Sequence, residues 1–347
     1  MKRANREDVA RLAGVSTAVV SYVINNGPRP VAEATRSRVI AAMDELRYRP
    51  NASARALKLA RTNVIGLLMW DITNPYFSEM AKYMQERAHE RGYGLMIGNT
   101  GQDGIEETAE LHNMLGREVD GIALSGVRRP ETLTAIARSG VNVISMDWHL
   151  AAPDIPSVGI DDYGATREAV EHLLWHGHTE VGLIAGIDDL TLREKSWSDT
   201  MSARCTPERL KELTAYGDFT RQGGYQAAID LLKRPNPPKA IFVSSDVQAF
   251  GVVRAVQHLG LNIPNDVAII SLDGTDASAF TYPSLTVIRL PLDEIAKHVV
   301  DKLTSHGADE RMHTTFPHTL IPRESCGCVS PEHAGREDVR AFSHSQS

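Results

Sequence analysis

Residues 7–25 read EDVARLAGVSTAVVSYVIN and divide at Gly14 into two short helical patterns. Small apolar residues precede the glycine, and larger aliphatic residues recur at helical spacing from Val19 to Ile24. Gly14 suits a turn that needs a positive φ, and Ser16 can cap the second helix. The layout predicts a helix-turn-helix, whose second helix enters the major groove of DNA. An ordinary helical hairpin would show the same local pattern.

Charge separates the beginning of the chain from the rest. Residues 1–61 hold 12 Lys and Arg against 5 Asp and Glu, a net charge of +7. The whole chain carries −7, so residues 62–347 carry −14. A small basic head on an acidic body is typical of a nucleic-acid-binding module joined to another domain. The charge therefore favours the helix-turn-helix over the hairpin.

Length and composition fit a globular protein of more than one domain. The chain has 347 residues, of which 42% are hydrophobic and 23% charged. No run approaches the ~20 apolar residues of a membrane span, and no apolar secretory segment follows the first charges. The three cysteines, Cys205, Cys326 and Cys328, do not form a disulfide framework. We expect a cytoplasmic protein with no membrane contact.

A third helix and a hinge follow the helix-turn-helix. Val39, Ala42, Met43 and Leu46 form one apolar stripe at helical spacing, and Pro50 ends that helix. Residues 52–60 are about two turns of strong helix formers, which is too short for a stable isolated helix in water. DNA and a second protomer can supply the missing partner. We expect a DNA-binding head over 1–50 and a hinge helix over 51–61.

Four ordered motifs in this region resemble those of one family. They are A-G-V-S at 13–16, V-S-x-V-x-N at 20–25, T-R-x-x-V at 35–39 and L-x-Y-x-P-N at 46–51. Together they are similar to the lactose-repressor (LacI/GalR) family of bacterial transcription regulators, and the similarity continues to about residue 328. In that family, hinge helices of a dimer enter the minor groove, where a leucine from each protomer kinks the duplex. Leu57 occupies that position, with Ala54 one turn earlier on the same face.

The resemblance also implies which residues of the head contact DNA. Base edges would be contacted by Thr17, Ala18, Ser21 and Tyr22, and phosphates by Asn25, Arg29, Tyr48 and Asn51. Ser16 and Lys58 complete the expected DNA-binding set. Many family members carry arginine where this chain has Tyr22, and arginine can bind guanine with a pair of hydrogen bonds worth about 1–3 kcal/mol. The half-site that Tyr22 selects stays open.

After residue 61, short apolar runs alternate with helical patterns. Strands are expected at 64–69, 94–98, 121–125, 141–146, 181–185, 240–244 and 267–272, and helices near 75–91, 106–116, 162–176, 221–233 and 247–260. This alternation predicts an α/β body with parallel sheets and right-handed crossovers, in two linked lobes. The resemblance implies the periplasmic-binding-protein-like fold, with crossings between lobes near 161, 290 and 320. The body is expected to span 62–328, and residues 329–347 are expected to be a disordered tail.

Ligands of such sheets bind beyond the carboxyl ends of the strands, here between the two lobes. The candidate effector residues at those ends, or at the family's ligand positions, are Phe77, Asp147, Trp148, Arg193, Phe219, Ser245, Asp246 and Asp273. Arginine and carboxylates bind adjacent hydroxyls in pairs, and an aromatic face stacks on an apolar ring face. This chemistry suits a sugar or a sugar derivative. Aspartate at a strand end is also a common helix cap, which is the alternative for each acidic candidate.

Two departures from the family leave the identity of the ligand open. The charged pair Glu194-Lys195 follows the arginine where apolar residues are common in the family. Ser245 stands where many sugar-responsive members have asparagine, and a hydroxyl makes fewer hydrogen bonds than an amide.

Enzyme and metal alternatives find little support in the sequence. His172 and His176 are spaced i and i+4, but Leu173 stands where a metalloprotease motif needs glutamate. Cys326 and Cys328 can ligate a metal, yet we see no second pair to join them and interpret them as a feature of the tail. We therefore expect no enzymatic activity, no cofactor and no metal.

The expected function is sequence-specific DNA binding by a transcriptional regulator, acting as a repressor. We expect it to bind a palindromic double-stranded operator as a homodimer, because twofold sites match twofold proteins. A small carbohydrate-like effector would control the affinity for the operator, as either an inducer or a co-repressor. The alternative is a sugar-binding transport or sensor protein without DNA binding, against which the basic head argues.

Overall fold

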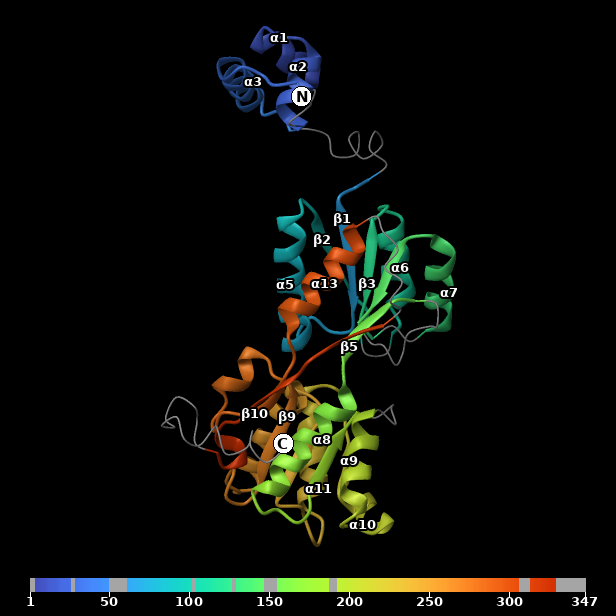
Figure 1. Ribbon diagram of the computed structural model, residues 1–347, viewed down its shortest axis with the longest axis vertical. Coiled ribbons are helices and arrows are strands. Elements are labelled where there is room, and N and C mark those ends of the chain that lie inside the picture. The colour runs from blue at the N-terminus through green and yellow to red at the C-terminus, as the bar shows by residue number, and fades with distance from the viewer. Residues whose placement is uncertain are drawn as a thin grey trace. The chain divides into compact units, whose positions relative to one another are not determined.

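The computed structural model describes residues 4–25, 29–49, 61–101, 104–126, 129–146, 155–186, 192–305 and 313–328 (Figure 1). The chain divides between Thr62 and Asn63 into two compact units, which we call the head and the body. Among the described residues, no helix is both long and apolar enough to cross a membrane.

The head consists of α1 (Arg6–Ala13), α2 (Thr17–Asn25) and α3 (Glu33–Glu45). Gly14 ends α1 in the left-handed conformation, with φ 65° and ψ 40°, and the backbone N–H of Val19 donates to Ser16 Oγ over 3.4 Å. The core of the head contains Val9, Ala10, Ala13, Val20, Val23, Val39, Ala42 and Tyr48. The predicted helix-turn-helix with a third packed helix is confirmed.

The first lobe of the body is built on a six-stranded parallel sheet. Its strands, in spatial order, are β11 (His313–Phe316), β5 (Ser157–Ile160), β4 (Asn142–Ser145), β3 (Gly121–Leu124), β1 (Val64–Met69) and β2 (Gly94–Asn99). Leu67 packs in one core with α5 (Pro75–Glu90) and α13 (Leu292–Thr304). The next residue, Leu68, packs in another core with α6 (Glu107–Leu115) and α7 (Pro130–Ser139). Because successive side chains of a strand point to opposite faces, the sheet is covered on both sides.

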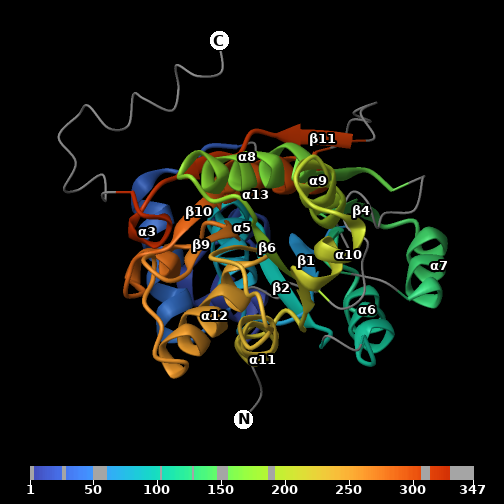
Figure 2. The same cartoon turned by 90° about the horizontal axis from the view of Figure 1, so that it is seen from below.

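The second lobe repeats this plan with one antiparallel edge. Its strands, in spatial order, are β12 (Thr319–Ile321), β10 (Thr286–Arg289), β9 (Ala268–Asp273), β8 (Ala240–Val243), β6 (Gly182–Ala185) and β7 (Thr214–Tyr216), with β12 antiparallel to β10. Its helices are α8 (Asp162–Trp175), α9 (Leu192–Ser202), α10 (Pro207–Glu212), α11 (Arg221–Leu232) and α12 (Asp246–His258), with short 3-10 turns η1 (Asp276–Phe280) and η2 (Glu324–Cys326). Figure 2 shows these helices around their sheet from below.

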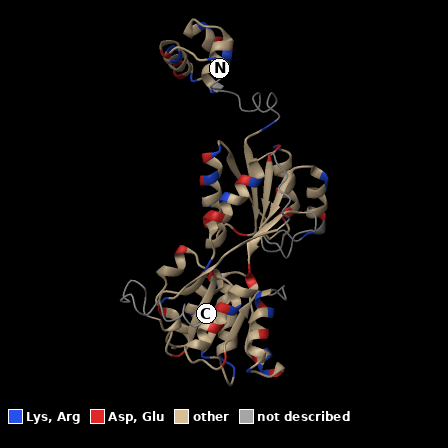
Figure 3. Ribbon diagram, viewed as in Figure 1, with Lys and Arg blue, Asp and Glu red and all other residues tan. Residues whose placement is uncertain are grey.

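Charged residues lie mainly on the helices and loops of the body, whereas the strands are nearly free of them (Figure 3). Strands of a parallel sheet that is covered on both faces have apolar residues at nearly every position, as in VIGLLM of β1 and AIFV of β8. The predicted α/β architecture with two parallel sheets is confirmed.

The chain passes between the lobes three times within the described residues. It leaves the first sheet after Ile160 of β5 and enters α8 at Asp162. It returns after Arg289 of β10 to enter α13, and it crosses again between β11 and β12. The start of α8 therefore lies directly after a connection between the lobes.

Candidate functional site

Arg193, near the start of α9, is a cation of the candidate effector site, and two hydrogen bonds hold its side chain in place. Its Nε donates to Asp162 Oδ1 over 2.7 Å, and its Nη1 donates to the backbone oxygen of Ser244 over 2.7 Å. The side chain is 21% exposed. Burial lowers the pKa of Arg193, but the nearby carboxylates of Asp162 and Asp273 more than offset it, so the pKa is raised. The guanidinium is therefore charged and held in one orientation.

A pair of buried aspartates lies beside this cation. Asp273 ends β9 with φ 117°, a conformation that L-residues rarely adopt, and its Oδ2 accepts the backbone N–H of Asp246 over 3.1 Å. Burial raises the pKa of Asp273 and the charge of Asp246 raises it further, while Arg193 opposes both effects. A strained, buried carboxylate facing a cation is typical of a functional site.

The carboxylate of Asp246 is held by three hydrogen bonds from the protein. The carboxylate is fully buried and accepts from Ser271 Oγ over 2.6 Å and from both the backbone N–H and the hydroxyl of Thr275 over 2.7 Å. Burial raises the pKa of Asp246 to about 6, although these hydrogen bonds favour the charged form. Asp246 thus holds the loop that follows β9 in place, directly after Asp273, the last residue of that strand.

Aromatic rings from both lobes lie close together. Trp70 follows β1, and its ring centroid lies 6.4 Å from that of Phe77 in α5 and 6.0 Å from that of Phe219 in the second lobe. Tyr76 packs edge-on against Phe77, with centroids 5.0 Å apart, and contributes to the raised pKa of Arg193. The rings and the guanidinium therefore belong to one site.

The lobes also touch through a hydrogen bond between α5 and η1. The backbone N–H of Asp276 donates to Glu79 Oε1 over 2.8 Å. Burial raises the pKa of Glu79, while this hydrogen bond favours its charged form. Asp276 directly follows Thr275, which donates two hydrogen bonds to Asp246.

The structure thus brings together five of the predicted effector residues, namely Phe77, Arg193, Phe219, Asp246 and Asp273. Ser245 serves as the N-cap of α12, where its Oγ accepts the backbone N–H of Gln248 over 3.4 Å. Asp147 and Trp148 lie outside the described residues. Sequence reasoning missed Trp70, Tyr76 and Asp162. Trp70 directly follows a predicted strand, so the rule that ligands bind at the carboxyl ends could have found it.

The predicted DNA-binding residues of the head fall into three groups. Thr17 and Ala18 are exposed in the first turn of α2, and Ser21 and Tyr22 are partly exposed one turn later on the same face. Ser16 and Arg29 are exposed, whereas Tyr48 is only 9% exposed and packs in the core, so little of its side chain can reach a phosphate. Asn51, Ala54, Leu57, Lys58 and the side chain of Asn25 lie outside the described residues.

The expectation that the two cysteines near residue 328 lack a second pair was wrong. His172 in the last turn of α8 and His176 at its C-cap approach them: His172 Nε2 lies 3.3 Å from Cys326 Sγ, and His176 Nε2 lies 3.2 Å from Cys328 Sγ. The four residues form a group with metal-ligand chemistry. About 150 residues separate the pairs in the sequence, so only the fold could join them.

A basic helix-turn-helix head followed by a two-lobed body with a charged, aromatic-lined site defines a class: DNA-binding regulators controlled by a small ligand. Two family models match the chain. Residues 7–51 match bacterial regulatory proteins of the lacI family, and residues 170–326 match a periplasmic binding protein-like domain.

Similarity over nearly the whole length settles the family. The chain is 34% identical to catabolite control protein A of Priestia megaterium, over 92% of this chain and 98% of the relative. It is 36% identical to the ribose operon repressor of Escherichia coli (strain K12), over 86% and 92% of the two chains. It superimposes on the lac repressor dimer bound to operator and the anti-inducer ONPF with a TM-score of 0.80, 27% identity and coverage of 94% and 99%. The chain belongs to the lacI family of bacterial regulatory proteins, and it is a transcriptional regulator with an effector-binding body.

Proposed function

We propose that this chain represses transcription from a palindromic operator as a homodimer, and that a small sugar or sugar derivative sets its affinity for the operator. The observation that carries the proposal is the fixed guanidinium of Arg193 beside Asp273 and the aromatic rings. The same residues bind the ligand without transforming it, in keeping with relatives that are regulators rather than enzymes. We place this action in the bacterial cytoplasm, on nucleoid DNA.

The chemistry of the site favours a polyhydroxy ligand. Arg193 offers N–H donors in a fixed plane and Asp273 offers acceptor oxygens, which together can bind two neighbouring hydroxyls of a sugar. Phe77, Phe219 and Trp70 present apolar faces of the kind that stack on a sugar ring. A relative named the ribose operon repressor makes pentoses the first ligands to try.

We propose that Arg193, Asp273, Phe77 and Phe219 contact the effector directly, and that Asp246 and Ser245 hold the surrounding loops. This division follows from burial and hydrogen bonding. The oxygens of Asp246 already accept three hydrogen bonds from the protein, and Ser245 is committed to its helix cap. Asp147 and Trp148 stay candidates on the sequence alone.

A panel of purified sugars tests the effector proposal. Thermal unfolding of the full chain is followed with pentoses, hexoses and their phosphates, because a ligand that binds only the folded state raises the Tm. We expect at least one sugar to raise the Tm of the wild type and to leave the Tm of Arg193→Ala unchanged. Arg254→Ala, which removes an exposed arginine of α12, is the control and should respond like the wild type. A sugar that stabilises Arg193→Ala equally well would remove Arg193 from the site.

On the DNA side, we propose that Thr17, Ala18, Ser21 and Tyr22 read base edges and that Leu57 wedges the central base step. Unstacking that step costs a few kcal/mol, which apolar burial and the seating of both heads offset. Leu57→Ala should therefore lose most of the operator affinity while the body still binds its sugar. Operator affinity equal to that of the wild type would contradict the wedge.

A further inference from the structure

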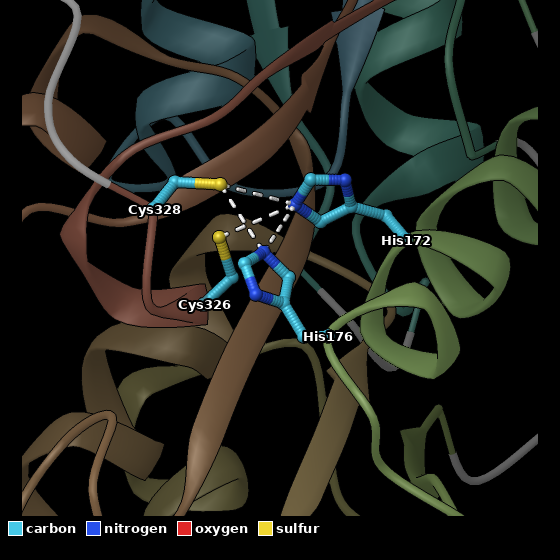
Figure 4. Close-up of side chains that lie close together, drawn as sticks. All are labelled: His172, His176, Cys326 and Cys328. Atoms are coloured by element: carbon cyan, nitrogen blue, oxygen red, sulfur yellow. Dashed lines mark hydrogen bonds between the residues drawn. The ribbon is translucent and has the colours of Figure 1, made fainter. Parts of the chain in front are cut away.

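Two histidines and two cysteines converge in the second lobe, at the opposite end of α8 from Asp162 (Figure 4). His172 lies in the last turn of α8 and His176 caps its end, while Cys326 ends η2 and Cys328 follows after one glycine. One ligand atom from each side chain can be chosen so that all four lie within 4.8 Å of one another. Figure 4 shows both sulfur atoms facing the two imidazole rings.

The spacing of these atoms matches the edges of a small coordination tetrahedron. The two Nε2 atoms are 3.2 Å apart, and three of the four nitrogen–sulfur separations are 3.2, 3.3 and 3.6 Å. Zinc bonds of about 2.0–2.1 Å to nitrogen and about 2.3 Å to sulfur place tetrahedral ligands about 3.3–3.4 Å apart for two nitrogens and about 3.5–3.6 Å for nitrogen and sulfur. These four separations are therefore within a few tenths of an ångström of the zinc values, and the remaining two lie within 4.8 Å.

Burial, a hydrogen bond to one sulfur and the backbone between the two cysteines all fit a metal site formed by these four side chains. His172 is 1% and Cys326 is 2% exposed. Thr286 Oγ1 lies 3.0 Å from Cys326 Sγ and can donate to a thiolate, as groups behind metal ligands commonly do. Gly327 has φ 97°, a left-handed conformation that glycine adopts without strain, and it lets the backbone reverse between the two cysteines.

We propose that His172, His176, Cys326 and Cys328 bind one Zn²⁺ in a closed structural site. Two thiolates and two imidazoles are a ligand set that selects zinc over calcium or magnesium. Four protein ligands fill a tetrahedral shell and leave no position for substrate, which is the mark of a structural rather than a catalytic zinc site. The thiols lose their protons when the metal binds. The ion would fasten the segment after β12 to α8, the helix whose first residue, Asp162, holds Arg193.

Metal content measured on the full chain tests the site. The protein is produced with zinc in the medium, without a polyhistidine tag, and is passed into metal-free buffer before zinc is counted by mass spectrometry. We expect about one zinc per wild-type chain. His176→Gln and Cys328→Ser alter the two partly exposed ligands and should lose most of it. Cys205→Ser, which changes the partly buried cysteine outside the cluster, should retain it.

Cobalt provides a readout that does not depend on any variant folding. Wild-type protein stripped of metal and loaded with Co²⁺ should show the visible absorption of tetrahedral cobalt and a thiolate-to-metal charge-transfer band. Three results would overturn the proposal: wild type that takes up neither zinc nor cobalt, equal loss of zinc in Cys205→Ser and Cys328→Ser, or a disulfide between Cys326 and Cys328 in protein prepared without oxygen.

Discussion

The guanidinium of Arg193 is bonded over 2.7 Å to the carboxylate of Asp162, the first residue of α8. The chain has just left the first lobe at this point, so the ion pair joins the cation of the effector site to a connection between the lobes. A ligand that engages Arg193 therefore acts next to a connection between the lobes. A coupling of about 1–3 kcal/mol between this site and the operator would be enough for regulation.

Replacing Arg193 should separate effector response from DNA binding. Arg193→Ala removes the paired donors to the ligand and leaves the head unchanged, so we expect operator affinity near that of the wild type and no response to the sugar. Arg193→Lys keeps the charge without the planar fork and should weaken sugar binding about tenfold or more. Fluorescence anisotropy on labelled operator, titrated with sugar, measures both effects. A normal sugar response in Arg193→Ala would contradict the role of this residue.

The ring of Phe219 should contribute to ligand affinity and little else. Phe219→Ala removes the second-lobe member of the aromatic group, and we expect the Kd for sugar to rise about tenfold, which corresponds to a stacking contribution of ~1.4 kcal/mol. Calorimetric titration of the sugar measures the change. Phe280→Ala is the matched control, because Phe280 is 89% exposed in η1. Equal weakening by both substitutions would argue against stacking on Phe219.

Asp246 should act through its hydrogen bonds rather than through the ligand. Asp246→Ala leaves the N–H and hydroxyl of Thr275 and the hydroxyl of Ser271 without their acceptor, and we expect a loss of roughly 2–4 kcal/mol in the stability of the body. Asp246→Asn keeps the shape, its amide oxygen can accept both bonds from Thr275, and its NH2 group can donate to Ser271 Oγ, so it should cost much less. Chemical denaturation of both variants makes the comparison. A mild effect of Asp246→Ala would mean that the carboxylate is not a brace.

The same residue predicts a dependence of stability on pH. The folded pKa of Asp246 is about 6, above that of an unfolded aspartate, because burial disfavours the charged form. The folded state thus takes up a proton more readily, and the contribution of Asp246 to stability grows as the pH falls through 6 and shrinks as the pH rises. Between pH 7.5 and 5, the wild type should gain stability relative to Asp246→Asn. A difference between the two proteins that does not change with pH would contradict the raised pKa.

Gly14 should be replaceable only by residues that accept a left-handed backbone. A Cβ at this position has open space around it, so the cost of a substitution comes from φ 65° alone. Gly14→Val should destabilise the head by at least ~1 kcal/mol, and Gly14→Asn by less, since asparagine tolerates this conformation. Amide hydrogen exchange within α1 and α2 reports the stability of the head. Equal protection in the two variants would show that the turn does not need a positive φ.

Much of the fold could be predicted because long apolar runs and helical periodicity are local signals. The run VIGLLM is β1, and the pattern near 75–91 is α5. Short edge strands such as β7, with three residues, hold too little pattern to be seen. Helix α9 was not predicted because the sequence LREKSWSDTMS has no apolar stripe; only Ser196, Trp197 and Met201 are buried along it.

The site was predictable only in part, because cap residues and ligand residues are of the same types. Arg193, Phe219 and Asp273 follow strands or match the family's ligand positions, and the structure groups them. Nothing in the sequence distinguishes Asp273 from Asp246, since both are aspartates at the ends of strands. Burial and hydrogen bonds separate their roles. The partnership of His172 with Cys326 depends on the packing of α8 against the last strands, which no local pattern records.

Selection from a random DNA pool by the purified full chain tests the central claim most directly. The selection is run without ligand and, in parallel, with a mixture of sugars, and the bound DNA is sequenced. We predict enrichment of one twofold-symmetric sequence with a central C-G step, more strongly in one of the two conditions. Enrichment without sugar would make the sugar an inducer, and enrichment only with sugar would make it a co-repressor. Recovery of no symmetric sequence in either condition would contradict the assignment as an effector-controlled repressor.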